Sequence, residues 1–400
     1  MFRHLLKLTW QRKTRNFMLS LEIMLAFAVV FAIAAAAVRS VQLYRMPLGF
    51  DGDGLWSVEL RPENGGKGRI DAATYDTFKR SVLGMPEVVH AAFVSIEPYA
   101  LSTMSTTMKG PGDVRIRTDM VDASDGAAQA LGLDLVDGRW FSTLDDGGAT
   151  LPVVINRRLA HALFPGQAAV GRQFTDTDRD QKQAYKVVGV VGEYRGKGEL
   201  MTPENFAFVR FAPGTGVDTG RDPRVLVLKL RSGTPRSFET RLNRRLKGVH
   251  NDWSYQITPL SAQRSSTLRA RFAPLVIIAT IAAFVLLMVA FGLFGTLWQN
   301  THQRIPEIGL RRAVGARAAD IYGQIVAEQL LLSTLAMVLG LVLLVQLPLT
   351  GALGETLNWT VFLGAAGLSM GVIYLLSLLC SLYPGWRASR LSPTEALHYE

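Results

Sequence analysis

Four long stretches of the chain are strongly apolar, and they dominate its hydrophobic pattern. Their only charged residues are Glu22 in the first stretch and Glu328 at the edge of the third. A helix needs about 20 apolar residues to cross the hydrocarbon core of a bilayer, and uncharged stretches of this length are typical of membrane spans. The pattern therefore predicts four transmembrane helices, at residues 17–38, 272–298, 328–348 and 359–383.

The first apolar stretch has a second interpretation, because basic residues precede it and small residues (34–37) close it, as in a cleaved signal peptide. The apolar region of a signal peptide is typically about 7–15 residues long. The stretch here has 22 residues. We therefore favour a retained transmembrane helix and keep cleavage as the alternative.

Basic residues beside the apolar stretches indicate the orientation of the chain. Five precede the first stretch, four lie in the 299–327 link and two follow the fourth stretch, whereas the 349–358 loop has none. Lys and Arg are enriched in short cytoplasmic segments. We therefore expect the N-terminal segment (1–16), the 299–327 link and the C-terminal tail (384–400) to be cytoplasmic. The 39–271 segment and the short 349–358 loop then lie outside.

Composition and charge agree with a membrane protein that carries a large polar domain. Hydrophobic residues make up 48% of the 400 residues and charged residues 19%, which is too apolar for an ordinary soluble domain. The formal net charge is +10, of which the 39–271 segment carries +6 without a long basic run. A nucleic-acid-binding surface would cluster its charge, so this class is excluded. The single cysteine, Cys380, rules out an intrachain disulfide.

The external 39–271 segment shows two strand–helix–strand patterns, which we interpret as two halves of one α/β subdomain. The halves cover about 50–118 and 220–260, and a lobe of about 119–219 is inserted between them. A stalk helix over 261–271 is expected to run directly into the second transmembrane helix. In the two halves we expect strands at 55–60, 88–96, 225–230 and 253–257 and helices at 72–83 and 238–246. In the lobe we expect strands at 151–155, 187–191 and 207–211 and a helix at 157–164.

The sequence contains no recognisable motif for catalysis, cofactor binding or metal binding. The glycine-rich run 192–198 has the wrong spacing for a phosphate-binding loop and lacks Ser or Thr after Lys197. The six histidines are scattered, without a pair at the spacing of metal ligands, and no Gly-x-Ser-x-Gly elbow occurs. We therefore expect no catalytic site, cofactor or metal on this chain.

The cytoplasmic link is expected to contain a short amphipathic helix. Pro306 suits the first turn of a helix, Glu307 and Arg311 are spaced as an ion pair, and Gly315 is typical of a helix end. A second helix then starts near Ala318 and runs into the third span. From these residues alone the short helix could be an interface anchor, a membrane-surface helix or a docking element. Its apolar edge is formed by Leu310, Ala313 and Val314.

The link and three further segments resemble the permeases of the MacB/FtsX type of ABC transporter. The resemblance lies in the run Glu-Ile-Gly-Leu-Arg-Arg-Ala-Val-Gly-Ala at 307–316 and in the tail at 383–400. Outside the membrane it lies in 151–166 with Gly171, and in 185–192. The resemblance implies an integral membrane fold of four transmembrane helices plus a large α/β extracytoplasmic domain, in which a split porter-like subdomain carries the inserted lobe.

In this family the short cytoplasmic helix would be the coupling helix that seats in a groove of the ATPase subunit. Glu307, Arg311 and Arg312 would then make polar contacts, and Leu310 and Val314 apolar ones. A solvated helix face or a lipid headgroup contact is the alternative interpretation of each charge. The residues expected to couple to the ATPase are Pro306, Glu307, Ile308, Gly309, Leu310, Arg311, Arg312, Val314 and Gly315.

The resemblance also implies partners. Only 16 residues precede the first span, so we expect a separate ABC ATPase subunit, which would bind ATP and Mg. We expect a second permease protomer, in a homodimer or a heterodimer, surrounded by membrane lipid. A periplasmic adaptor and an outer-membrane channel are further candidate partners. The expected location is the bacterial inner membrane, with the large domain in the periplasm.

The function expected from the resemblance is export, in which ATP hydrolysis by the partner moves the periplasmic domain by mechanotransmission and drives efflux of a small molecule or peptide. One alternative is a mechanical signal transmitter to a periplasmic partner such as a cell-wall hydrolase. Another is extraction of lipoproteins from the inner membrane. A membrane-tethered sensor domain would not require four spans and a shaped cytoplasmic link.

Overall fold

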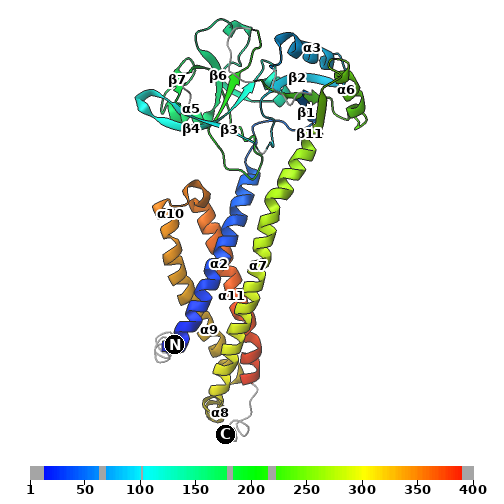
Figure 1. Cartoon of the computed structure of the whole chain (residues 1–400). Helices are drawn as coiled ribbons and strands as arrows, with labels where there is room; N and C mark the ends of the chain where they lie inside the picture. Colours follow the sequence, from blue (N-terminus) through cyan, green and yellow to red (C-terminus); the bar gives the residue numbers. More distant parts are fainter. Residues whose placement is uncertain (1–12, 63–68, 101, 178–182, 215–221, 390–400) are drawn as a thin grey trace. The chain divides into compact units, whose positions relative to one another are not determined.

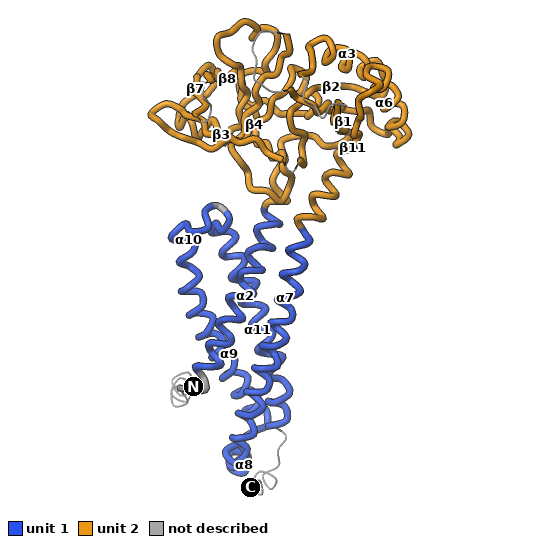
Figure 2. The backbone as a smooth tube through the Cα atoms, viewed as in Figure 1, with its two compact units in different colours: residues 1–42, 272–400 blue, residues 43–271 orange. Residues whose placement is uncertain are grey.

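The computed structural model describes residues 13–62, 69–100, 102–177, 183–214 and 222–389. The chain divides into two compact units, coloured separately in Figure 2. Unit 1 contains residues 1–42 and 272–400, and unit 2 contains residues 43–271. The C-terminal tail motif from residue 390 onward and the N-terminal basic residues before residue 13 lie outside the described residues.

Unit 1 is built from helices, and the described part of the chain has four helices that are long and apolar enough to cross a membrane. Three of them contain a predicted apolar stretch in full. The helix at the third stretch covers it except for residues 345–348. These helices are α2 (Lys13–Arg45), α7 (Leu260–Gln303), α9 (Ala318–Leu344) and α11 (Trp359–Ser389). The shorter elements are α8 (Ile305–Ala313), α10 (Gln346–Thr350) and the 3-10 turn η3 (Gly354–Leu357).

The helices of unit 1 pack through small residues and a few hydroxyl groups. A Cβ atom added at Gly340 of α9 would lie 2.8 Å from the Phe27 ring of α2, so a larger residue would force these helices apart. The Ser333 and Ser377 hydroxyls lie 2.8 Å apart and join α9 to α11. Close approach at small residues and hydrogen bonds between hydroxyls are typical of helix packing in lipid. Helix α7 differs from the other long helices, because only 11% of its most apolar stretch is buried against other parts of the chain.

Unit 2 contains a split α/β subdomain, as the sequence predicts (Figure 1). Its strands lie in the order β11-β1-β10-β2, all antiparallel to their neighbours, so the two halves of the sequence alternate in one sheet. This is the arrangement of a ferredoxin-like β-α-β-β-α-β unit. The first half contains β1 (Leu55–Arg61), α3 (Ala72–Leu83) and β2 (Val88–Val94); the second contains β10 (Val225–Leu230), α6 (Phe238–Lys247) and β11 (Ser254–Pro259).

Helices α3 and α6 bury the apolar face that their sequence periodicity predicts. Asp71 caps α3, because its side chain accepts a hydrogen bond from the Thr74 backbone amide at 3.1 Å. The buried residues of α3 and α6 belong to one hydrophobic cluster, which also includes residues of β1, β2 and β10. Both halves of the sequence therefore contribute to one core. The buried helix residues are Tyr75, Phe78 and Val82 from α3, and Phe238, Leu242 and Leu246 from α6.

The inserted lobe forms a closed ring of strands, and its strands begin at residue 104, earlier than the start predicted near residue 119. The pairing runs β4-β3-β7-β8-β6-β9 and returns from β9 to β4, while β5 pairs with β8. The sequence predicts β6, β8, β9 and α5 but not β3, β4, β5 or β7. The lobe contains β3 (Met104–Lys109), η1 (Pro111–Asp113), β4 (Arg115–Ala123), α4 (Ala127–Leu131), β5 (Leu135–Gly138), η2 (Thr143–Asp145), β6 (Leu151–Asn156), α5 (Arg157–Leu163), β7 (Gln173–Asp176), β8 (Ala184–Val191) and β9 (Phe206–Arg210).

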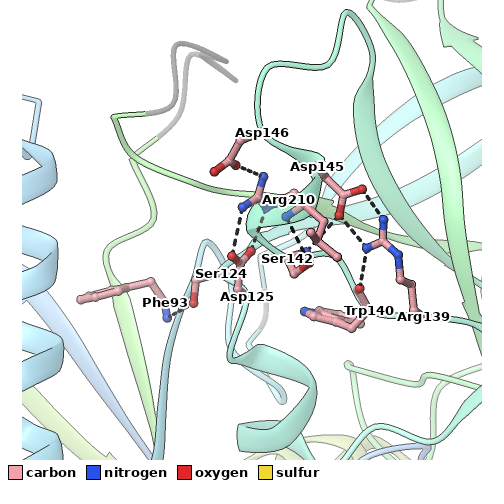
Figure 3. Close-up of polar contacts among 10 residues, drawn as sticks. Phe93, Ser124, Asp125, Arg139, Trp140, Ser142, Asp145, Asp146 and Arg210 are labelled. Carbon is pink, nitrogen blue, oxygen red and sulfur yellow. Dashed lines mark hydrogen bonds and ion pairs between the residues drawn. The ribbon is translucent and has the colours of Figure 1, made fainter.

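A polar network lies in the lobe, beside its junction with the split subdomain (Figure 3). Strands β2 and β4 pair at only one position, Val94 with Ala123. Beside it, the Arg210 guanidinium at the end of β9 is 5% exposed and contacts Asp125 at 2.8 Å and Asp146 at 2.5 Å. Asp125 lies in the turn after β4 and Asp146 in the loop after η2, so one guanidinium group holds both segments. Arg210 therefore supplies much of the order at this junction.

We expect Arg210→Gln to loosen the junction locally, because Asp125 and Asp146 lose their shared cation. Both carboxylates are partly exposed, so the expected cost is about 1–3 kcal/mol. Hydrogen–deuterium exchange of peptides covering 206–211 and 142–148 measures it directly in the full chain.

The matched control for this experiment is Arg115→Gln, whose side chain is exposed and lies 3.8 Å from Asp113. An exposed pair of this kind contributes about 0–1 kcal/mol, so its peptides should exchange almost as in the unmodified protein. Equal protection in the two variants would contradict the role given to Arg210.

Candidate functional site

The short helix α8 lies in the link between α7 and α9, where the sequence predicts a short amphipathic helix. Pro306 lies in its first turn, and the helix ends at Ala313, two residues before Gly315. Gly315 has a φ of +101°, a backbone conformation that residues with a Cβ rarely adopt. The turn is closed by Asp320, which accepts a hydrogen bond from the Arg317 backbone amide at 3.1 Å. Chain reversal between α8 and α9 is therefore fixed by local geometry.

One face of α8 is packed against other helices of unit 1. Ile308 is only 6% exposed and belongs to a small apolar cluster with Ile321 of α9 and Ala388 of α11, against which Ile325 packs. Gly309 is also buried. The resemblance assigns both residues to the ATPase contact, whereas the structure places the Ile308 side chain against α9 and α11 of its own chain. A movement of α8 would therefore be passed to α9 and α11.

Two large apolar side chains are exposed away from this packed face, one in α8 and one in the turn that directly follows it. Leu310 is 63% exposed and Val314 is 82% exposed. Pro306, Glu307 and Gly315 are also exposed on this link. Leu310 and Val314 are four residues apart, so they form one small exposed apolar surface. We call Leu310 and Val314 the exposed edge of α8.

Polar side chains brace α8 against the first turns of α9. Arg311 contacts Glu307 at 2.6 Å, as its i,i+4 spacing predicts, and its second terminal nitrogen donates to Gln324 of α9 at 2.7 Å. Gln324 in turn donates to Glu328 at 2.9 Å, and Glu328 also contacts Arg304 at 2.5 Å. Arg311 is therefore engaged within the chain as well as available at the surface.

The sequence analysis missed Arg304, Gln324 and Glu328, although the i,i+4 spacing of Gln324 and Glu328 is a recognisable signal for neighbours on one helix face. Arg312 lies within α8, but its side chain is outside the described part of the structure. Among the described residues no group of His, Cys, Asp and Glu side chains could hold a metal ion. Helix α8 therefore combines a packed face with exposed apolar and charged side chains.

A second polar cluster lies in unit 2, where Lys197 contacts Asp119 at 2.7 Å and Glu204 at 2.6 Å. Burial alone would raise the pKa of Asp119, but hydrogen bonds from Glu204, Lys197 and two hydroxyls outweigh it and lower the pKa to about 2. Burial and the neighbouring Asp119 raise the pKa of Glu204. The adjoining cavity has a volume of about 40 Å³, enough for roughly one or two waters, so it does not suit a drug-sized substrate.

Comparison with known proteins places the whole arrangement in a family. Residues 18–244 match the family model described as the MacB-like periplasmic core domain, and residues 279–393 match the FtsX-like permease C-terminal model. A macrolide export ATP-binding/permease protein MacB from Bdellovibrio bacteriovorus is 24% identical over 97% of this chain and 60% of its own length. A pyoverdine export ATP-binding/permease protein PvdT from Pseudomonas syringae is 26% identical over 66% of this chain and 40% of its own length.

The chain thus spans about 40 to 60% of the length of these relatives. Among solved structures, the periplasmic region of MacB from Actinobacillus actinomycetemcomitans aligns with 56% of this chain and 97% of its own, at a TM-score of 0.40 and 13% identity. The periplasmic core match alone covers more than half of the chain, and the permease match covers most of the remainder. The chain therefore belongs to the MacB/FtsX family of ABC transporter permeases.

Proposed function

We propose that this chain is the permease of an ABC export complex and that α8 docks on an ABC ATPase lying outside these 400 residues. The observation that carries the proposal is the division of α8 into two faces. Its Ile308 face is packed on α9 and α11, while Leu310 and Val314 are exposed for a partner. A helix held in this way passes force from a bound partner to the transmembrane helices instead of yielding to it.

The proposed orientation places α8 and both termini in the cytoplasm and unit 2 in the periplasm, with the four long helices in the inner membrane. Arg304, Arg311 and Arg317 all lie on the α8 side of the spans, whereas the 349–358 loop at the other end has no basic residue. This asymmetry follows the positive-inside rule. An ATPase that binds ATP and Mg in the cytoplasm would therefore meet α8.

Helix α7 supports a second protomer in the complex. Its apolar side chains are mostly exposed in the single chain, including Ile277, Phe284 and Phe291. This surface suits both lipid and the corresponding helix of a second permease copy. Closure of two ATPases on ATP would then move both α8 helices, and the continuous α7 would pass the movement to unit 2.

The substrate is proposed to be a small molecule or peptide, in line with the macrolide and pyoverdine export named for the relatives. No catalytic step is assigned to this chain, because hydrolysis belongs to the ATPase. Passage through the rest of the cell envelope would require a periplasmic adaptor and an outer-membrane channel.

We expect Leu310→Gln with Val314→Gln to abolish co-purification of the ABC ATPase in mild detergent. The exposed edge would lose its apolar surface, while the fold should be unaffected because neither side chain is buried. Immunoblotting or mass spectrometry of the purified complex measures the ATPase. Leu349→Gln with Leu353→Gln is the matched control, since these leucines are also exposed but lie in and beside α10, far from α8 in the sequence. ATPase retained in the first variant would contradict docking at this edge.

We expect the charge exchange Glu307→Lys with Arg311→Glu to uncouple the complex. The exchange keeps an i,i+4 ion pair, so the helix itself should lose only about 0.2–0.5 kcal/mol. It inverts the charges offered to the ATPase and also removes the hydrogen bond from Arg311 to Gln324 of α9. The measurement is substrate-stimulated ATP hydrolysis by the reconstituted complex, which should be lost. The corresponding exchange of Lys109 and Asp113, an exposed i,i+4 pair in unit 2, should leave it unchanged. Unchanged stimulation in the α8 variant would count against the proposal.

A further inference from the structure

The loop 192–204 of unit 2, between β8 and β9, contacts the ends of both long helices that continue into unit 1. It approaches α2 through Arg195, approaches α7 through Glu199, and reaches the strands of the lobe through Lys197. The two helices carry no such connection to the lobe along the chain, because α7 directly follows β11 of the split subdomain. We call residues 192–204 the clamp loop.

On the α2 side, the clamp loop binds the end of the helix with a buried cation. Arg195 is 4% exposed, and its guanidinium donates to the Leu43 carbonyl at 2.9 Å and the Met46 carbonyl at 3.2 Å. Its backbone amide donates to the Leu48 carbonyl at 2.8 Å. At Gly49, an added Cβ would lie 1.4 Å from the Glu193 carbonyl oxygen, so the two backbones touch. The guanidinium contacts alone would be ordinary capping of carbonyl groups at a helix end by Arg. The close approach of the two backbones goes beyond such capping.

On the α7 side, the clamp loop offers a buried carboxylate. Glu199 accepts hydrogen bonds from Arg264 of α7 at 2.5 Å and from the Tyr99 hydroxyl at 3.1 Å. Thr267, one turn further along α7, donates to the Tyr99 carbonyl at 3.4 Å. Tyr99 itself has a φ of +67°, which is strained for a bulky residue and persists only where the surroundings impose it.

On the lobe side, the clamp loop is fixed to the closed ring of strands. Lys197 contacts Asp119 of β4, and the Glu204 carbonyl accepts from the fully buried Asn156 side chain at the end of β6 at 2.8 Å. The Asn156 side chain also accepts from the Phe206 amide at the start of β9. One short loop therefore joins α2, α7 and three strands of the ring.

We infer that the clamp loop transmits movement of α2 and α7 to the inserted lobe, with the Glu199–Arg264 contact as its connection to α7. The inference rests on the proposed function, in which ATP moves these helices. The split subdomain follows α7 through the direct β11–α7 link. The lobe is reached by the clamp in addition to the apolar core that it shares with the split subdomain and with Leu260 of α7. Arg264 and Glu199 are positioning residues in this scheme, because they act on the lobe through the loop.

The test uses the full permease with its ATPase in lipid nanodiscs, in a Cys380→Ala background. Spin labels are placed singly by Leu144→Cys in the lobe, Arg236→Cys in the split subdomain or Met288→Cys in α7, all at exposed positions. Distances between the two protomers are measured without nucleotide and with trapped ATP. In the unmodified protein, all three distances should change with nucleotide.

Arg264→Gln and Glu199→Gln should clearly reduce the change at position 144 and keep those at 236 and 288. Arg264 is largely exposed, so its replacement leaves the core intact. Arg264→Lys should restore the change, and Arg269→Gln, an exposed Arg of the same helix, should not affect it. A purely structural role would not separate the lobe from the other two reporters.

Two results would overturn the inference in different ways. An unaltered change at position 144 in both Gln variants, or its loss in Arg269→Gln, would contradict the clamp while leaving the proposed function standing. No nucleotide-dependent change at position 288 in the unmodified protein would contradict the ATP-driven function itself, and the transmission role with it.

Discussion

The structure depends on one constraint, that a backbone crossing lipid must satisfy its own hydrogen bonds. Water cannot do so in the bilayer core, so the four apolar stretches can only be helices. Apart from Glu22, charged side chains then lie toward the helix ends, and it is there that this chain places its charged contacts. Inside unit 1, packing relies on small residues such as Gly340 and on hydroxyl pairs such as Ser333 with Ser377.

Helix α7 shows how the ends are used. Near its N-terminal end, Arg264 contacts the buried Glu199 of the clamp loop. Just beyond its C-terminal end, Arg304 contacts Glu328 of α9, and α8 is held by Ile308 and by Arg311. A helix with fixed contacts at each end and apolar side chains between them can carry displacement with little loss.

Much of the fold follows from the sequence, and the exceptions have physical causes. The spans and helices α3 and α6 are predictable because their apolar positions repeat locally and their caps are adjacent in sequence. Strands β3 and β4 are not, since their residues are largely polar and their burial comes from pairing in a closed ring with segments up to about a hundred residues away. The exposed edge of α8 is likewise predictable from the periodicity of Leu310 and Val314. The anchoring role of Ile308 is not, because its partners Ile321 and Ala388 come from two other helices. Arg195 and Glu199 lie in a glycine-rich run that looks like an ordinary loop, and only the tertiary structure brings them to α2 and α7.

The most direct test of the account is photo-crosslinking from position 314 in intact bacterial membranes, with a benzophenone amino acid in place of Val314. Val314 is 82% exposed, so the probe should leave the fold unchanged and lie at the proposed contact. The account predicts a crosslinked product with an ABC ATPase, identified by mass spectrometry, and none from the same probe at the exposed Leu349. Crosslinks from position 314 to lipid alone, with an efficient probe and the ATPase present in the membrane, would contradict it.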